Sequence, residues 1–555
     1  MASSRKEALD AARGSIPADI VCRCAGIYNP FTCSWDTGSL AIKDGIVLGI
    51  GEYSGVQEYD FEDQFIVPGL INAHVHIESS LLTPREYSRL AALHGTTTAI
   101  ADPHEIANAA GIRGIEFMLA EREGAAIDIR YLLPSCVPAT PLDKGGAVLE
   151  ARDLAPFIAK EGILGLGEMM NVPGVLAGDP GITAKLNLSP IRDGHAPALT
   201  GRDLNAYCLA GLQSDHECTT LHEAAGKLRA GMYIFIREGS TERNIGSLVP
   251  LVTPATVSRC CFATDDSHAD LLAAEGDIDR CIRRAIGCGL PPELALRMAT
   301  LSPAERFGLS DRGALVPGRR ADFCVIDDPQ KFTVLSVFRA GTKVSAGQRV
   351  TSPSPPESFG CTTPSPGSLR IDGCGRARVI ALVPLQIRTE SAYYDVDGSH
   401  LPDLDRDILK AVVVNRYRRA PCGIGLVHGF GFRCGAIASS VSHDAHNIIA
   451  VGTSDAEILR AIDEVIRVKG AMVAVAGTTR TLLPLDCAGL MSTLPAEQVA
   501  ARMTELARTT GLMEGIADPF MYLSFLALTV IPELRVTDRG VFDAVAFRDV
   551  PLFVE

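Results

Sequence analysis

The sequence lacks a surplus of basic residues. Its 555 residues include 52 Lys and Arg but 66 Asp and Glu, which gives a formal net charge of −14. Because nucleic-acid binding depends on cations that neutralise phosphates, this balance argues against a nucleic-acid partner. The sequence also lacks any run of the roughly 18 apolar residues that a membrane span requires, so we expect no membrane partner.

Two further patterns are missing. The opening MASSRKEALDAARG has no apolar stretch of the kind that signal peptides carry. The 16 cysteines are numerous but follow no repeated spacing, so they do not predict a disulfide framework. We therefore expect a cytoplasmic protein with reduced thiols. Cys22 and Cys24 could bind a metal, although we favour buried structural thiols at these positions.

The sequence has ample material for a folded core. Hydrophobic residues make up 47% of the chain and charged residues 21%, as in globular proteins. The length suggests about three or four domains. Composition and periodicity predict an N-terminal arm at 1–17, a small β-domain at 18–67 with 311–349, a barrel at 68–310, a Pro/Ser-rich linker at 350–368 and a C-terminal α/β-type domain at 369–555.

From residue 68 onwards, strand-like apolar segments alternate with helical ones. About eight such strands occur before residue 310, among them GLINAHVH, TTTAIADPHE and ILGLGEMM. Regular alternation of strand and helix predicts an α/β protein with a parallel sheet, and eight repeats predict a (β/α)8 barrel.

Metal-binding or titratable residues follow most of these strands. Barrel enzymes carry their chemistry at the carboxyl ends of the strands, so such residues would converge on one rim. In the first strand His74 and His76 are two residues apart and point to the same face. The full set is His74, His76 and Glu78; Asp102, His104 and Glu105; Glu168; His195; Asp215, His216 and Glu217; and Asp265 and Asp266. We assign structural roles to His94, His222, His268 and His400.

This set of side chains suits a pair of metal ions. Four imidazoles and two carboxylates could hold two divalent cations about 3.5–4 Å apart, with the carboxylate of the fourth strand between them. Such a pair lowers the pKa of a bound water, which makes hydroxide available at neutral pH. Imidazole and carboxylate ligands suit Mn²⁺, Fe²⁺ and Zn²⁺.

The longer motifs resemble those of the bacterial adenine deaminases, a family of the amidohydrolase superfamily. The similar segments include PGLINAHVHIESSLLTP, HGTTTAIADPHEIANAAG, DGHAPALTGRDLNAY and DPFMYLSFLALTVIPELRVTDRG. They cover nearly the whole chain apart from the N-terminal arm and the linker. The resemblance implies a metal-dependent hydrolase barrel that converts adenine to hypoxanthine and ammonia (adenine aminohydrolase, EC 3.5.4.2), with Mn²⁺ the expected metal and a homo-oligomer the expected assembly.

The resemblance also implies roles for individual residues. The expected metal ligands are His74, His76 and Asp265 for one ion, His195 and His216 for the other, and Glu168 as the bridge. Many amidohydrolases have a carbamylated lysine in the bridging position, but the fourth strand here reads GEMM and offers no lysine. Asp265 could also accept a proton from the hydroxide and hand it on.

Several assignments stay open at this stage. We expect Asp102 and His104 to be catalytic, and Glu78, Glu105 and Glu217 to contact the substrate. The division of roles among Asp102, His104 and Glu105 is not fixed, because Asp102 precedes Pro103 as in many turns and Glu105 could cap a helix. Asp266 is an alternative to Asp265 as the ligand.

Two other functions fit the same residues. Another amidohydrolase, such as a different aminopurine deaminase or a cyclic amidase, could use the same metal pair. A catalytically inactive metal-binding scaffold is the alternative of a different class. The C-terminal segment SHDAHN, with His443 and His446, could form another metal site or reach over the barrel mouth, but we favour a hydrogen-bonded turn.

Overall fold

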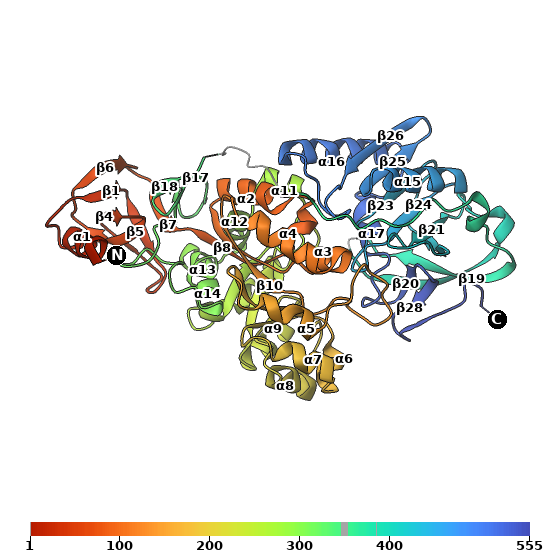
Figure 1. Ribbon diagram of the computed structural model, residues 1–555, viewed down its shortest axis with the longest axis horizontal. Coiled ribbons are helices and arrows are strands. Elements are labelled where there is room, and N and C mark those ends of the chain that lie inside the picture. The colour runs from red at the N-terminus through yellow and green to blue at the C-terminus, as the bar shows by residue number, and fades with distance from the viewer. Residues whose placement is uncertain (1, 346–352, 385, 555) are drawn as a thin grey trace.

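The computed structural model describes residues 2–345, 353–384 and 386–554. A central barrel lies between a small β-unit near the N-terminus and a large domain that contains the C-terminus (Figure 1). Residues 346–349 of the predicted β-domain and 350–352 of the predicted linker lie outside the described residues. Among the helices that the structure describes, none is both long enough and apolar enough to cross a bilayer.

The barrel consists of eight parallel strands, as predicted. They form two sheets, β12-β11-β10-β9-β8 and β13-β14-β15. A parallel bridge between Val75 and Asp265 joins the end of the first strand to the segment after the last one. The strands are β8 (Leu70–Val75), β9 (Thr96–Ala101), β10 (Asp128–Leu133), β11 (Ile163–Met169), β12 (Arg192–Gly194), β13 (Ser214–Asp215), β14 (Tyr233–Arg237) and β15 (Cys260–Ala263).

Helices follow the strands and surround the barrel (Figure 1). Thr83 precedes the first of them and Pro84 occupies its first position, where a missing N–H costs nothing. The helices are α2 (Pro84–Leu93), α3 (His104–Ala110), α4 (Ile112–Arg122), α5 (Ala151–Leu154), α6 (Val172–Leu176), α7 (Pro180–Leu186), α8 (Gly201–Leu209), α9 (Leu221–Arg229), α10 (Ile245–Leu248), α11 (Ala269–Glu275), α12 (Ile278–Gly287), α13 (Pro292–Met298) and α14 (Leu301–Arg306).

An apolar cluster fills the barrel interior. Phe235 of β14 packs 6.1 Å from Phe307, which follows α14, and its ring also lies 6.5 Å from His74. The buried members of the cluster from the strands are Ile71, Ala73, Ile100, Leu132, Phe235, Cys261 and Ala263. The polar residues at the carboxyl ends of the strands therefore lie directly above an apolar cluster inside the barrel.

The small β-unit is built from chain segments on both sides of the barrel. Strand β16 (Phe323–Ile326), after the barrel, pairs antiparallel with β7 (Phe65–Pro68), before it. Its two sheets have the orders β5-β4-β1-β6 and β18-β17-β16-β7-β2-β3. The remaining elements are α1 (Ala2–Ala12), β1 (Ala18–Arg23), β2 (Gly26–Asn29), β3 (Ser34–Asp36), β4 (Ser39–Lys43), β5 (Ile46–Gly51), β6 (Gly55–Asp60), β17 (Val334–Arg339) and β18 (Thr342–Lys343).

The C-terminal domain is richer in strands than the sequence pattern predicts. Its main sheet has the order β20-β19-β22-β21-β24-β23-β25-β26 and is antiparallel except for the pair β19 and β22. Its strands are β19 (Cys374–Leu382), β20 (Thr389–Asp397), β21 (Ile408–Val414), β22 (Gly423–His428), β23 (Ala436–Ser439), β24 (Ile448–Gly452), β25 (Ala471–Ala476) and β26 (Thr479–Pro484), with a second sheet of β27 (Leu534–Thr537), β28 (Gly540–Asp543) and β29 (Arg548–Asp549).

This domain packs directly on the barrel. Its helices are α15 (Asp455–Arg467), α16 (Ala496–Gly511) and α17 (Pro519–Phe525), and α16 lies against α2 and α11 of the barrel. The backbone N–H of Ser492 donates to the carbonyl of Leu81, in the loop after β8, over 2.8 Å. The C-terminal domain thus contacts a loop at the carboxyl end of the barrel, where barrel enzymes have their sites.

One buried amide closes the seam between the first and last barrel strands. Nδ2 of Asn72 lies 2.6 Å from Oγ1 of Thr264 and 3.1 Å from Oδ1 of Asp277. Its Oδ1 accepts from the backbone N–H of Thr264 over 3.3 Å. Because Asn72 is fully buried, no solvent can replace these bonds.

We predict that Asn72→Ala destabilises the barrel. The change leaves buried polar groups on both sides of the seam without their partner, at a cost of about 1–3 kcal/mol. Thermal denaturation should show a midpoint several degrees lower, whereas Asn187→Ala at the exposed end of α7 should leave it unchanged. Equal midpoints for Asn72→Ala and the native chain would contradict the role of this seam.

Candidate active site

The six predicted metal ligands meet at the carboxyl end of the barrel. They come from the ends of five strands, with His74 and His76 both at the end of β8, so their convergence is a consequence of the barrel closure. All are buried except His195, which is partly exposed. They are His74, His76, Glu168, His195, His216 and Asp265.

The carboxylate of Glu168 lies at the centre of this group. Its Oε2 is 2.9 Å from Nδ1 of His195 and 3.0 Å from Nε2 of His216. Its Oε1 is 3.4 Å from Nε2 of His76. One carboxylate therefore faces histidines from the first strand on one side and from the fifth and sixth strands on the other.

Asp265 closes the group from the opposite side. Its Oδ1 lies 3.1 Å from Nε2 of His76 and 3.6 Å from Nε2 of His74, while Oδ2 accepts from Nη1 of Arg237 over 2.6 Å. Asp265 has a φ of +52°, a conformation that non-glycine residues rarely adopt and that is common at functional sites. Backbone hydrogen bonds to His74 and His76 hold it there.

The donor set fits two divalent metal ions. His74, His76 and Glu168 form one cluster of ligand atoms within 4.8 Å of one another, and Glu168, His195 and His216 form a second. The two clusters share Glu168, so two cations would be adjacent. Nε2 of His74 also lies only 3.1 Å from Nε2 of His76. Imidazole and carboxylate ligands are those that Mn²⁺, Fe²⁺ and Zn²⁺ accept.

The electrostatics keep the carboxylates ready to bind a cation. Burial opposes ionisation of Glu168, but hydrogen bonds with His195 and His216 outweigh it and hold the pKa of the carboxyl well below its usual range. Burial likewise opposes ionisation of Asp265, and the guanidinium of Arg237 outweighs it, so that this pKa is also held well below normal. Both are ionised at neutral pH, as metal ligands must be.

Asp102 contacts two of the predicted metal ligands, Glu168 and His76. Its Oδ2 accepts from the backbone N–H of Glu168 over 2.8 Å, and its carbonyl oxygen lies 3.0 Å from Nδ1 of His76. A Cβ atom at Gly167 would lie only 2.0 Å from Asp102 Oδ2, so the GEMM strand needs glycine at this position. Asp102 thus orients two of the predicted ligands, as outer partners of metal ligands commonly do.

His104 and Glu105 extend the polar group towards the C-terminal domain. His104 lies between two carboxylates, with Nδ1 at 3.3 Å from Glu168 Oε1 and Nε2 at 3.4 Å from Glu105 Oε1. Glu105 is buried and contacts two histidines of the C-terminal domain, His443 and His446. The segment DPHE is therefore continuous with the carboxylate and histidine group.

The other two predicted substrate contacts have protein partners. Oε1 of Glu78 accepts from the backbone N–H of Ile106, in the first turn of α3, over 3.1 Å. The helix-capping role considered for Glu105 thus belongs to Glu78, and burial raises the pKa of the Glu78 carboxyl to about 7. Glu217 forms a two-pronged ion pair with Arg237, at 2.7 and 3.0 Å.

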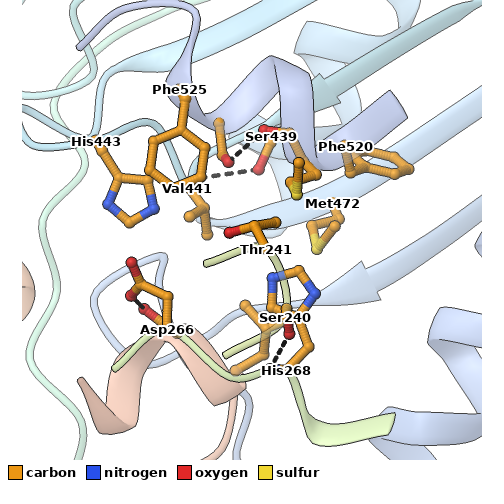
Figure 2. A pocket seen from close by; sticks show the side chains of 14 residues that line it. Ser240, Thr241, Asp266, His268, Ser439, Val441, His443, Met472, Phe520 and Phe525 are labelled. Carbon is orange, nitrogen blue, oxygen red and sulfur yellow. Dashed lines mark hydrogen bonds between the residues drawn. The ribbon is translucent and has the colours of Figure 1, made fainter. Parts of the chain in front are cut away.

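A pocket opens between this rim and the C-terminal domain (Figure 2). Its cavity volume is about 30 Å³, so its walls must move apart to admit a molecule as large as a purine. Asp266, next to Asp265, and His268 line its barrel side, while His443, Phe520 and Phe525 line the opposite side. Asp266 also lies within 4.8 Å of the ligand atoms of His76 and Asp265, which connects the pocket to the metal ligands.

The structure adds to the sequence-based interpretation at three places. His268, to which we assigned a structural role, lines the pocket. The segment SHDAHN does form a turn, in which the backbone N–H of His446 donates to the carbonyl of Ser442, but its histidines also reach over the barrel mouth. Arg237 was missed, although it ends strand β14 and the strand-end rule would have found it.

Comparisons with known proteins agree with this architecture. The model of the amidohydrolase family matches residues 65–344, and the model of the adenine deaminase C-terminal domain matches residues 386–548. The chain is 64% identical to the adenine deaminase of Methanoregula boonei over 98% of both chains. It is 60% identical to that of Methanoculleus marisnigri, over 93% of this chain and 99% of that one, and 40% identical to that of Geobacillus kaustophilus over the whole of both.

We predict that metal binding releases protons from the site. Burial disfavours the charged form of His216, but its hydrogen bond to Glu168 outweighs this and raises its pKa to about 9. At pH 7.5 the imidazole of the metal-free protein is therefore protonated and must lose its proton before it can bind a cation. Affinity for Mn²⁺ should therefore increase as the pH rises from 7.5 through about 9.

Calorimetric titration with Mn²⁺ in two buffers of different ionisation enthalpy measures this release directly. His216→Gln should release about one proton fewer than the native chain, and His222→Gln, at an exposed position of α9, should release the same number. Heats that are independent of the buffer would rule out the protonated His216.

Proposed function

This chain belongs to the adenine deaminase family of the amidohydrolases, and we infer that its barrel site hydrolyses adenine to hypoxanthine and ammonia. The observation that carries this inference is the buried Glu168, which is shared by two clusters of histidine ligand atoms. Full-length relatives named adenine deaminase, at 40–64% identity, support the same substrate and reaction.

We propose that His74, His76 and Asp265 hold one metal ion and that His195 and His216 hold the other, with Glu168 shared between them. When bound, the metal pair lowers the pKa of a water molecule so that hydroxide is available at neutral pH. The clustering of the ligand atoms supports this division, and Mn²⁺ is the metal that we propose. Asp102 is a positioning residue in this account, because its contacts are with Glu168 and His76.

The reaction requires a proton to move from the attacking water to the substrate. The oxygen of water adds to C6 of adenine, one proton of the water passes to a ring nitrogen and the other to the amino group, and the C6–N bond then breaks to release ammonia as the C6 carbonyl forms. Asp265 is ionised and faces the metal ligands, so we assign to it acceptance of the proton from water. Arg237 keeps Asp265 charged until that step. To His104, which lies between Glu168 and Glu105, we assign transfer of the proton to the ring.

We also propose that the enzyme works in the cytoplasm as a homo-oligomer. All 16 cysteines are free thiols, which suits a reducing compartment. The homo-oligomeric state is proposed from the family resemblance alone, because the most exposed apolar side chains that the structure describes, such as Leu209 of α8 and Val56 of β6, lie on separate elements and form no patch.

We predict that Glu168→Gln abolishes turnover. A neutral amide cannot pair with two cations or with the surrounding imidazoles as a carboxylate does. Hypoxanthine formation from adenine, followed by chromatography after reconstitution with Mn²⁺, should fall to background, and the native chain should be more active with Mn²⁺ than with Fe²⁺ or Zn²⁺. Glu161→Gln is the matched control, because Glu161 is 83% exposed and pairs with Arg122 at the surface, before the amino end of β11. Native-like activity of Glu168→Gln would refute the shared role of this carboxylate.

A further inference from the structure

The C-terminal domain contributes a histidine pair to the barrel mouth. His443 and His446 lie in residues 441–447, between strands β23 and β24 of the main sheet. Both contact the carboxylate of Glu105, which is 338 residues before His443 in the chain. Glu105 is only 2% exposed, so this contact is part of the packed interior. A buried carboxylate with an imidazole at each oxygen is a built arrangement and not a surface ion pair.

The hydrogen bonds of this pair define which ring nitrogens carry protons. Nδ1 of His446 accepts from the backbone N–H of Ser442 over 3.3 Å, so its proton is on Nε2, which donates to Glu105. Nδ1 of His443 lies 2.6 Å from Glu105 Oε1 and donates to it. The remaining nitrogen of His443, Nε2, is left for a partner other than Glu105.

The remaining edge of His443 faces the pocket. His443 is one of the residues that line it, and in Figure 2 its ring nitrogens point towards the side on which Asp266 lies. The ring of Phe525 stacks on it, with centroids 4.6 Å apart and planes 11° apart. Glu105 and Phe525 therefore fix both the direction and the plane of the imidazole.

The loop that carries the pair is itself held in an unusual conformation. His446 has a φ of +49°, which costs a non-glycine residue of the order of 1–3 kcal/mol. The hydroxyl of Tyr417 donates to the carbonyl of Ala445 over 2.8 Å and helps to hold this turn. A strained backbone that surrounding contacts enforce is typical of residues placed for a function.

The pocket combines a polar edge with apolar faces. His443, Asp266 and His268 supply titratable groups, serine and threonine hydroxyls supply the other polar groups, and Met472, Phe520 and Phe525 supply apolar surface. A flat heteroaromatic ring with nitrogen atoms at its edge matches such a pocket, because its faces can pack on side chains while its edge forms hydrogen bonds.

We propose that His443 is a specificity-determining residue of the deaminase, whose Nε2 forms a hydrogen bond with a ring nitrogen of the purine. Glu105 acts as the positioning residue that fixes the imidazole, and the C-terminal domain thereby completes the substrate pocket. The proposal rests on the proposed function, since it takes adenine as the substrate of the barrel site.

Two substitutions at His443 distinguish the contribution of Nδ1, which faces Glu105, from that of Nε2, which faces the pocket. His443→Asn retains a side-chain N–H near the position of Nδ1, towards Glu105, but removes the edge that faces the pocket. His443→Gln retains a polar group near the position of Nε2. We expect His443→Asn to lower kcat/KM for adenine about 10–100-fold, the loss expected for a buried hydrogen bond to substrate, and His443→Gln to recover part of it.

The matched control is His428→Asn. His428 lies in strand β22 of the same domain, is partly exposed, and has its Nδ1 3.2 Å from the carbonyl of Asp407. It does not line the pocket, so the same change of residue should leave kcat/KM unchanged. Thermal midpoint and metal content, measured for each variant, identify any general loss of folding.

Purine analogues provide a readout that a structural role would not affect. Adenine analogues with one ring nitrogen replaced by CH are tested as substrates or, where they are not deaminated, as competitive inhibitors. The penalty of His443→Asn should disappear for the one analogue that lacks the contacted nitrogen. A penalty of the same size for every analogue, or kcat/KM for adenine equal to that of His428→Asn, would overturn the proposal. A native chain that fails to deaminate adenine would instead refute the proposed function itself.

Discussion

The buried carboxylate of Glu168 is the group around which the rim is organised. Placing a charge inside a protein costs several kcal/mol unless partners surround it. Here imidazoles from the first, fifth and sixth strands face its oxygens, and Asp102 accepts from its backbone N–H. A neutral residue at position 168 of β11 would leave these histidines without a common charged acceptor. The closure of the barrel is what makes this arrangement possible, because segments almost 200 residues apart meet only when the sheet closes.

The same reasoning extends from the rim to the C-terminal domain. A barrel rim alone is an open, solvent-filled mouth, in which electrostatic contacts are weak. The C-terminal domain covers it with Phe520 and Phe525 and inserts His443 and His446 against Glu105. His104 links Glu105 to Glu168, so the contacts run without interruption from the C-terminal sheet to the metal ligands. The proposed substrate pocket is in this way a feature of the interface between the two domains.

The sequence was sufficient to predict the barrel and the gathering of its ligands, because parallel strands all end at one rim and their endings can be read from periodicity. Arg237 was within reach of the same rule and was missed only because no metal-binding residue marks that strand. The same rule could not predict the contact between Glu105 and His443. The way in which two domains pack together leaves no periodic signal in the sequence of either domain. The domain ranges and the roles of the individual site residues stay predictions.

The central claim is that Glu168 lies between two cations. Crystals of the protein grown with Mn²⁺, with data collected on both sides of the manganese absorption edge, test it directly. The account predicts two anomalous peaks, one beside His74, His76 and Asp265 and the other beside His195 and His216, with Glu168 in contact with both. A single peak, or peaks that Glu168 does not touch, would contradict it.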